Sequence, residues 1–291
     1  MKYHLAVDIG ASSGRHILGH VEQGRIVLEE VYRFENGPKK RGGRLCWDFD
    51  ALAREVVNGL KACAKLGKVP ATLGVDTWGV DFALVDREGR VLGDTVAYRD
   101  SRTQGMDALV EELIPAQELY RRTGIQKQSF NTIYQLMTVK CQSPELLEQA
   151  HRLLLVPDYL HYTLTGVMSN EYTEASTSGL VSAETKDWDR ELLDLLGFPQ
   201  KLFGPLSLPG TALGGLRPAL REELGFGCQV VLPASHDTGS AFLAVPAGEG
   251  DSVTLSSGTW SLLGVELETP VTTPESRAAN FTNEGGYQYR Y

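Results

Sequence analysis

The segment His4-Leu-Ala-Val-Asp-Ile-Gly-Ala-Ser-Ser-Gly-Arg15 carries the strongest signal of the fold class. Residues 5–9 form a short apolar run that ends in a carboxylate and a glycine, which predicts a buried strand followed by a tight turn. Two strand-like runs follow at residues 15–21 and 25–34, with Gln23-Gly24 between them as a hairpin turn. This part of the chain is therefore predicted to form strands joined by small-residue turns.

The turn between the first two strands carries residue types that suit an anion. Ala11 and Gly14 let the backbone approach a ligand closely, and consecutive N–H groups can form a concave anion site. Ser12 and Ser13 add hydroxyl donors, and Arg15 adds a positive charge. The alternative for this segment alone is an ordinary glycine-rich hairpin. It is not a Walker loop, because the sequence contains no Gly-x-x-x-x-Gly-Lys-Ser/Thr.

A second hairpin of small and hydroxyl residues is predicted at Leu255-Ser-Ser-Gly-Thr-Trp-Ser-Leu262. Gly258 and Thr259 lie at its turn. One such loop is weak evidence of a site. Two of them, each on a strand pair and far apart in the sequence, favour two phosphate-binding turns that face each other across a cleft.

The segment Ser235-His-Asp-Thr-Gly239 follows a strand-like run and precedes a predicted helix. In α/β sheets, ligands collect where strands end and helix N-termini point into the crevice. His236, Asp237 and Thr238 are therefore candidate site residues. Helix capping is the alternative for Asp237, and a hydrogen-bonded structural role is the alternative for His236.

A fourth candidate group combines Gly74-Val-Asp-Thr-Trp-Gly-Val-Asp-Phe82 with Ala97-Tyr-Arg-Asp-Ser-Arg102. It offers the aromatic face of Trp78 and three charged hydrogen-bonding side chains, those of Asp81, Arg99 and Asp100. That mixture suits a neutral, polyhydroxylated ligand. Core packing is the alternative for Trp78, and turn or salt-bridge roles are the alternative for Arg99 and Asp100.

Composition excludes several functional classes. The 291 residues are 42% hydrophobic and 22% charged, which is typical of a soluble globular protein. The formal charge of −9 argues against a broad nucleic-acid surface, and no apolar run reaches the ~18 residues of a membrane span. Four scattered cysteines indicate neither a zinc cage nor a disulfide framework. With no leader-like segment before residue 4, we expect a cytoplasmic protein.

Periodicity predicts a mixed α/β domain and the start of another. Leu52, Val56 and Leu60 recur every four residues, which indicates an amphipathic helix. Strands precede and follow it, helical segments dominate residues 104–149, and a new hairpin arises near residue 255. We place the boundary so that residues 1–243 form the first domain and residues 244–291 the incomplete second one.

Taken together, these segments resemble the FGGY carbohydrate kinases. The resemblance runs in order from Ala6 to about Gly286. Six segments are typical of the rhamnulokinase branch of that family: Ala11-Ser-Ser-Gly-Arg15, Cys46-Trp-Asp48, Asp76-Thr-Trp-Gly-Val-Asp-Phe82, Ala97-Tyr-Arg-Asp-Ser-Arg102, Phe130-Asn-Thr-Ile-Tyr-Gln-Leu136 and Asn283-Glu-Gly-Gly286.

The resemblance implies a ribonuclease-H-like fold of the actin/Hsp70 ATPase type in each half, with a sugar-binding N-terminal domain and a nucleotide-binding C-terminal domain. It implies transfer of phosphate from ATP, with Mg²⁺, to L-rhamnulose, giving L-rhamnulose 1-phosphate. Asp237 matches the general base, and Gly79, His236 and Thr238 match sugar contacts. The segment 11–15 and Thr259 match phosphate contacts, and Asp8 matches the carboxylate near the magnesium, directly or through water.

The chain departs from the family pattern in length. Members are much longer, so the remaining sugar and ATP contacts are missing, and we expect the isolated chain to be impaired. A kinase for another ketose, such as fuculose or xylulose, and a non-catalytic sugar-binding fragment are the alternatives, as is an actin/Hsp70-like nucleotide switch. The oligomeric state is not predicted.

Overall fold

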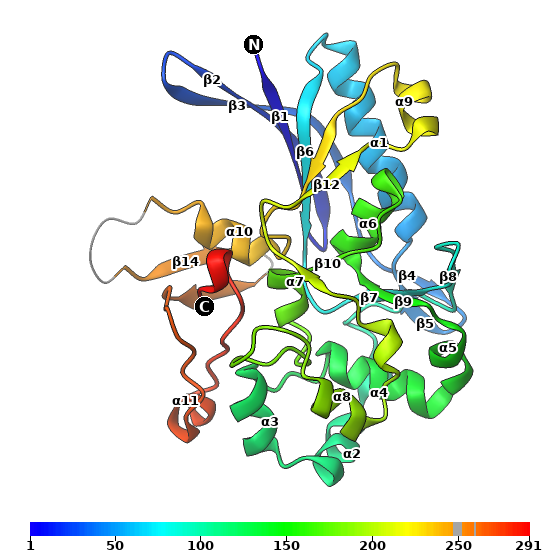
Figure 1. Cartoon of the computed structure of the whole chain (residues 1–291), viewed down its shortest axis with the longest axis vertical. Coiled ribbons are helices and arrows are strands. Elements are labelled where there is room, and N and C mark those ends of the chain that lie inside the picture. The colour runs from blue at the N-terminus through cyan, green and yellow to red at the C-terminus, as the bar shows by residue number, and fades with distance from the viewer. Residues whose placement is uncertain (247–251, 259) are drawn as a thin grey trace.

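The structure is a computed structural model that describes residues 1–246, 252–258 and 260–291. A six-stranded mixed sheet forms the upper part of the molecule (Figure 1). The strands run in the order β12 (Ala212–Gly215), β13 (Gln229–Val231), β6 (Pro70–Thr77), β1 (Tyr3–Ile9), β2 (Ser13–Glu22) and β3 (Arg25–Glu35). β1 pairs in parallel with β6 and β6 with β13, whereas β2, β3 and β12 are antiparallel to their neighbours. The predicted α/β class with a mixed sheet is therefore confirmed.

Three predicted site segments meet at one edge of this sheet. Asp8 near the end of β1 is in register with Asp76 near the end of β6. The next residue of β6, Thr77, forms a parallel bridge with His236, which follows β13. The parallel strands end at the same edge of the sheet. Asp76 and His236, which are far from Asp8 in the sequence, therefore lie close to the turn that follows β1.

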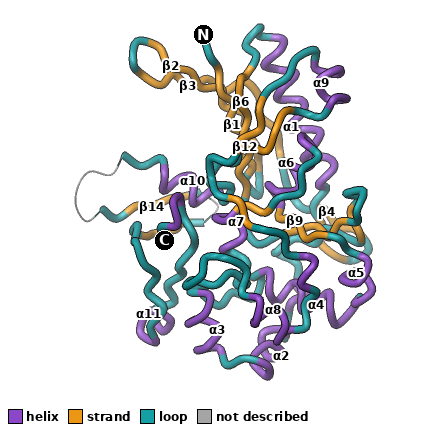
Figure 2. The backbone as a smooth tube through the Cα atoms, in the orientation of Figure 1, coloured by secondary structure: helices purple, strands orange, loops and turns teal. Residues whose placement is uncertain are grey.

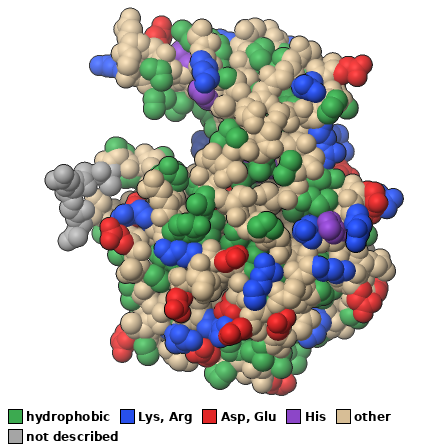
Figure 3. All heavy atoms as spheres, in the orientation of Figure 1, with side chains coloured by type: hydrophobic (Ala, Val, Ile, Leu, Met, Phe, Trp, Pro, Cys, Tyr) green, Lys and Arg blue, Asp and Glu red, His purple; other side chains and the backbone are tan. Residues whose placement is uncertain are grey.

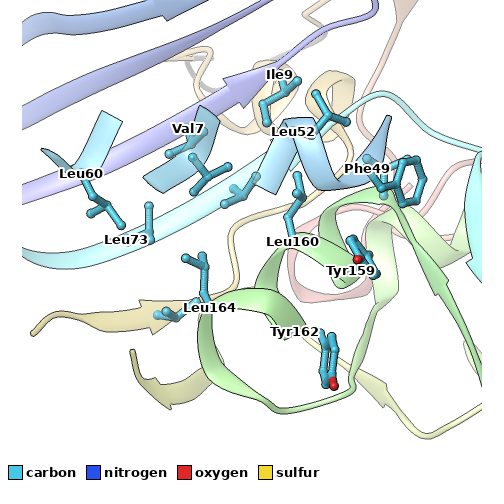
Figure 4. Close-up of a cluster of buried hydrophobic side chains, with 14 of the residues drawn as sticks. Val7, Ile9, Phe49, Leu52, Leu60, Leu73, Tyr159, Leu160, Tyr162 and Leu164 are labelled. Carbon is cyan, nitrogen blue, oxygen red and sulfur yellow. The ribbon is translucent and has the colours of Figure 1, made fainter. Parts of the chain in front are cut away.

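One face of the sheet is covered by α1 (Phe49–Lys65), α6 (Val156–Thr165) and α9 (Pro218–Leu224) (Figure 1). The side chain of Asp48 caps α1 by accepting from the Ala51 N–H. Leu52, Val56 and Leu60 of α1 are buried, as their spacing predicts. Figure 4 shows Leu52 and Leu60 packed toward side chains from β1, β6 and α6, where the main core lies.

A second, mostly helical region with its own core lies below the sheet. Figure 2 shows that the long strands lie in the upper part and short helices fill most of the lower part. The helices of this region are α2 (Met106–Leu113), α3 (Ala116–Thr123), α4 (Thr132–Gln142), α5 (Pro144–Gln149), α7 (Tyr172–Ser176) and α8 (Arg190–Leu196). Its small sheets are β8–β7–β9 (Val91–Leu92, Phe82–Val85, Arg152–Leu155), β4–β5 (Lys39–Arg41, Arg44–Cys46) and β10–β11 (Asn170–Glu171, Leu206–Ser207).

The last part of the chain lies beside the lower region. It comprises α10 (Asp237–Leu243), the hairpin β14–β15 (Thr254–Ser257, Ser261–Gly264) and α11 (Pro274–Ala278), which packs against α3. The hairpin forms where the sequence predicts it. Residue 243 ends α10, and the division into domains at this residue stays a prediction. Among the described residues, no helix is both long and apolar enough to cross a membrane.

Candidate functional site

A cavity of about 780 Å³ opens at the edge where β1 and β6 end. In Figure 3 the molecular outline is hollowed between the β2–β3 hairpin and the segment with α10 and β14. The cavity wall includes these predicted site residues: Asp8, Ala11, Ser12, Ser13, Arg15, Trp78, Gly79, His236, Asp237, Thr238 and Gly258. The structure places Gly14, Asp81, Arg99 and Asp100 off this wall, and Thr259 lies outside the described residues.

The first small-residue turn is held in place by backbone bonds and by one asparagine. The Gly10 N–H donates to the Ser13 carbonyl at 2.9 Å, which closes the turn. The Asn36 side chain donates to the Gly10 carbonyl at 2.8 Å, and its backbone N–H donates to the Ser12 carbonyl at 2.9 Å. With these carbonyls occupied, the turn presents a fixed backbone to the cavity.

Gly14 has a packing role behind this turn. A Cβ atom there would come within 2.2 Å of the Phe34 ring, which lies opposite it on β3. Glycine is therefore required so that β2 and the aromatic ring can approach each other.

Two carboxylates and one guanidinium converge on the cavity beside that turn. Arg15 donates to Asp8 from Nε at 2.8 Å and forms an ion pair through a second nitrogen at 2.7 Å. Asp76 lies next to Asp8 in the sheet register, and burial, with the charges of Asp8 and Asp237, raises the pKa of Asp76 well above its ordinary value. Sequence reasoning missed Asp76, although its place two residues before Trp78 in a strand was a usable signal.

These carboxylates fit Mg²⁺. The described residues contain no group of three or more side chains placed to hold a metal by themselves. Magnesium is usually bound through one or two carboxylates plus phosphate and water oxygens, and Asp8 could supply such a ligand with Asp76 beside it. Burial, and after it the charges of Asp8 and Asp237, raise the pKa of Asp76, so a bound cation would stabilise the ionised form of this carboxyl group.

Asp237 is the first residue of α10, and its carboxylate lies on the cavity wall. Oδ1 accepts hydrogen bonds from the Thr238 N–H at 2.6 Å and the Thr238 hydroxyl at 3.2 Å. Burial raises the pKa of Asp237, whereas the charge of His236 and the Thr238 bonds act in the opposite direction. The N-cap position belongs to His236, so capping does not account for Asp237.

His236 lies between two carboxylates. Its Nε2 is 3.6 Å from Oδ1 of Asp237, and its Nδ1 is 3.2 Å from Oε2 of Glu284. Burial lowers the pKa of His236, but the charges of Glu284 and Asp237 and the Glu284 hydrogen bond outweigh it and raise the pKa to about 9. Glu284 is a cavity residue that sequence reasoning did not select, although it stands in the Asn283-Glu-Gly-Gly286 segment.

Trp78 and Gly79 form another part of the cavity wall, and several hydrogen bonds hold the backbone there. Val80 has φ of 69°, a left-handed conformation that is costly for a β-branched residue. Its N–H donates to the Thr177 hydroxyl at 3.1 Å, and its carbonyl accepts from the Thr132 hydroxyl at 2.7 Å. A Cβ at Gly79 would come within 2.9 Å of Thr177 Oγ1, so the wall can approach Thr177 only with glycine at that position.

Three charged residues predicted to contact the ligand, Asp81, Arg99 and Asp100, lie behind or beside the cavity. Asp81 is fully buried and accepts both indole N–H groups of Trp47 and Trp78. Arg99 donates to the Tyr98 hydroxyl at 2.9 Å, and the carboxylate of Asp100 accepts from the backbone N–H groups of Leu45 and Arg102. Arg99 and Asp100 line a neighbouring depression of about 550 Å³. The structure therefore gives Asp81 and Asp100 internal partners.

The second small-residue turn closes the cavity from the C-terminal segment. Ser256, Ser257 and Gly258 line it, and the Gly258 N–H donates to the Trp260 carbonyl at 2.7 Å. The Trp260 ring lies 5.9 Å from the Phe130 ring, so an aromatic contact joins the hairpin to the lower region. The two turns expected to face each other therefore line one cavity.

Comparison with known proteins identifies the group to which this chain is similar. The N-terminal domain of the FGGY family of carbohydrate kinases matches residues 3–244. The rhamnulokinase of Halalkalibacterium halodurans is 49% identical over 291 residues, which cover 100% of this chain and 62% of the relative. The rhamnulokinase of Oceanobacillus iheyensis is 50% identical over 288 residues, 99% of this chain and 61% of the relative. The chain thus spans about three-fifths of the length of these curated relatives.

Solved structures support the fold. The xylulose kinase from Rhodospirillum rubrum superimposes with a TM-score of 0.84 at 18% identity, over 100% of this chain and 59% of that one. The ligand-bound xylulose kinase from Lactobacillus acidophilus gives a TM-score of 0.83 at 18% identity, with the same coverage. The fold is therefore the ribonuclease-H-like, actin/Hsp70-type fold of sugar kinases, as the resemblance implied. Because the family match extends over most of the chain and the rhamnulokinase relatives align along almost all of it, the chain belongs to the FGGY family of carbohydrate kinases.

Proposed function

We propose that this chain carries the sugar site and the base of a kinase that transfers the γ-phosphoryl group of ATP to L-rhamnulose, giving L-rhamnulose 1-phosphate. One observation carries the proposal: the Asp237 carboxylate lines the same cavity as two small-residue turns and the Trp78–Gly79 wall. A phosphoryl-transfer site needs these parts, namely a proton acceptor, phosphate-binding backbone and a wall that positions the alcohol. The names of the relatives support the choice of sugar.

Each part has a defined task in the proposed reaction. Asp237 accepts the proton of the primary hydroxyl while that oxygen bonds to the γ-phosphorus, and the bond to the ADP oxygen breaks in line. Backbone N–H groups and serine hydroxyls of the turn at residues 11–13, with the serine hydroxyls at residues 256 and 257, hold phosphate oxygens. When bound, Mg²⁺ supplies positive charge that offsets the phosphates and the neighbouring carboxylates. Because this reaction consumes ATP, we propose the cytoplasm as its compartment.

Recognition of the sugar is assigned to Trp78 and Gly79 and to the two residues that flank the base. The face of Trp78 suits the apolar side of a sugar, and His236 and Thr238 offer polar groups to its hydroxyls. Rhamnulose carries a methyl group where many ketoses carry a hydroxymethyl, and such a difference in an apolar pocket contributes only about 1–3 kcal/mol. Some binding of fuculose or xylulose is therefore expected, and a kinase for one of these is the alternative.

Binding calorimetry with the 291-residue chain tests this proposal. We expect L-rhamnulose to give a saturable heat and the Gly79→Ala variant to lose most of it, because a Cβ would press on Thr177 at 2.9 Å. Gly37→Ala is the matched control, since its Cβ would meet nothing within 4 Å. Absence of saturable heat with the wild-type chain would contradict the proposal, and tighter binding of fuculose or xylulose would support the alternative substrate.

We also propose that this chain alone turns substrate over slowly, because about two-fifths of the relatives' length has no counterpart in it. Incubation with L-rhamnulose, ATP and Mg²⁺ should then give sugar binding with little ADP. Rapid ADP release dependent on the sugar would show that the chain is sufficient for catalysis. Sugar binding with no ADP at all would favour the non-catalytic alternative.

A further inference from the structure

The residues on either side of Glu284 are anchored to the lower region of the molecule. The Asn283 N–H donates to the Gly124 carbonyl at 2.8 Å, and its side-chain NH₂ donates to the same carbonyl at 3.1 Å. On the other side, the Gly285 N–H donates to the Ser176 hydroxyl at 2.7 Å. These bonds fix the backbone of the segment that carries Glu284.

Gly285 allows this close approach. A Cβ atom at Gly285 would come within 2.5 Å of the buried ring of Tyr172. The backbone can therefore lie directly against α7, and Glu284 can extend into the cavity from that position. The Glu284 carboxylate, from the C-terminal segment, therefore faces the imidazole of His236, the residue before α10.

The surroundings of His236 favour a positive charge on its ring. A neutral imidazole has one N–H and one lone pair, so with carboxylates near both nitrogens, one carboxylate would face a lone pair. A protonated ring can donate from Nδ1 to Glu284 at 3.2 Å, and its positive charge attracts the Asp237 carboxylate 3.6 Å from Nε2. Glu171 and Asp76 also act on this ring, and both are acidic.

We infer that Glu284 is a positioning residue for the base: it fixes the His236 ring through Nδ1 and holds it as a cation beside the Asp237 carboxylate. The inference rests on the proposed function, because it concerns the base of that reaction. Asp237 is surrounded by negative charges, since Asp8 and Asp76 face the same cavity. A cation held next to Asp237 keeps its carboxylate ionised and ready to accept a proton.

NMR titration of the histidine side chains tests this without any kinase assay. The chain has six histidines, and the signal of His236 is assigned by its loss in His236→Gln. We expect its pKa to be about 9 in the wild type and to fall by more than about 1 unit in Glu284→Gln, because the strongest neighbouring charge is gone. Glu284→Asp retains a carboxylate, so its His236 pKa should lie between those of the wild type and Glu284→Gln.

Glu268→Gln is the matched control, because it removes one negative charge from the same segment at a side chain that is 85% exposed. It should leave the His236 titration within about 0.3 unit. A Glu284→Gln titration equal to the wild type overturns the inference. If that variant does not fold, a wild-type His236 pKa at or below its ordinary 6.5 overturns it as well. Loss of L-rhamnulose binding with the His236 shift intact would count against the proposed function and leave the pairing established.

Discussion

Nε1 of Trp47 donates a 2.6 Å hydrogen bond to Oδ2 of Asp81, although 34 positions separate the two residues. The same oxygen accepts from Trp78 Nε1 at 3.0 Å and from the Tyr98 N–H at 3.1 Å, and Gln135 Nε2 donates to the other oxygen at 3.0 Å. The Trp47 and Trp78 rings lie 4.2 Å apart. One buried carboxylate therefore sets the position of the aromatic wall of the cavity.

Asp81→Asn should destabilise the chain and displace Trp78. An amide has a single acceptor oxygen, so its NH₂ group would face the NH₂ of Gln135 or an indole N–H. Leaving one buried donor unpaired costs about 1–3 kcal/mol, which urea unfolding measures, and tryptophan fluorescence would report the altered indole environment. Asp107→Asn, at a 37% exposed ion pair with Lys127, should cost less than about 1 kcal/mol. Equal losses in the two variants would show that Asp81 has no special role.

Much of the fold follows from local sequence patterns. The apolar run at residues 5–9, the small-residue turn after it and the four-residue spacing of Leu52, Val56 and Leu60 each predict an element that the structure contains. The turns at Gly10 and Gly258 could be identified because clusters of small and hydroxyl residues between strand-like runs are typical of turns. Each of these patterns involves residues close together in the sequence, so it can be recognised without knowledge of the tertiary fold.

The direction of a charged side chain could not be predicted in the same way. Asp81, Arg99 and Asp100 were expected at the ligand, but the structure buries Asp81 beneath two indoles and turns Asp100 toward backbone N–H groups. Asp76 and Glu284 were not selected, although both line the cavity. Their roles depend on sheet register and on the docking of a distant segment, which are tertiary features.

Asp76→Asn should raise the stability of the chain at neutral and alkaline pH. Burial and the charges of Asp8 and Asp237 raise the folded-state pKa of Asp76, so the folded state loses stability as pH rises above about 3.8, the ordinary value. The amide removes this penalty, and we expect a gain of about 1 kcal/mol at pH 8 that shrinks toward pH 4. Urea unfolding at several pH values measures it, with the exposed Glu112→Gln as a control expected within about 0.5 kcal/mol. A loss of stability at pH 8 would contradict the account.

The His236–Glu284 pair should make stability depend on pH in a defined window. The pKa of His236 is raised from 6.5 to about 9 in the folded chain, so its contribution is complete below about 6.5 and is lost as pH rises through about 9. Unfolding of the wild type should therefore become easier across that window, and Glu284→Gln should show a smaller change. The two proteins should differ most just below about pH 6.5, where the contribution is complete, and least above about pH 10, where the imidazole is neutral in both. A difference that does not change with pH would contradict the pairing.

The proposed role of Asp237 is to accept the proton of the sugar alcohol, and a turnover measurement tests that role. Residues 1–291 can replace the matching part of the Halalkalibacterium halodurans rhamnulokinase, and the chimera can be assayed for ADP release dependent on L-rhamnulose, with and without Asp237→Asn. We expect the variant to retain the fold and sugar binding and to lose at least about 100-fold in kcat. Turnover of the variant within about threefold of the parent chimera would contradict the assignment of Asp237 as the base.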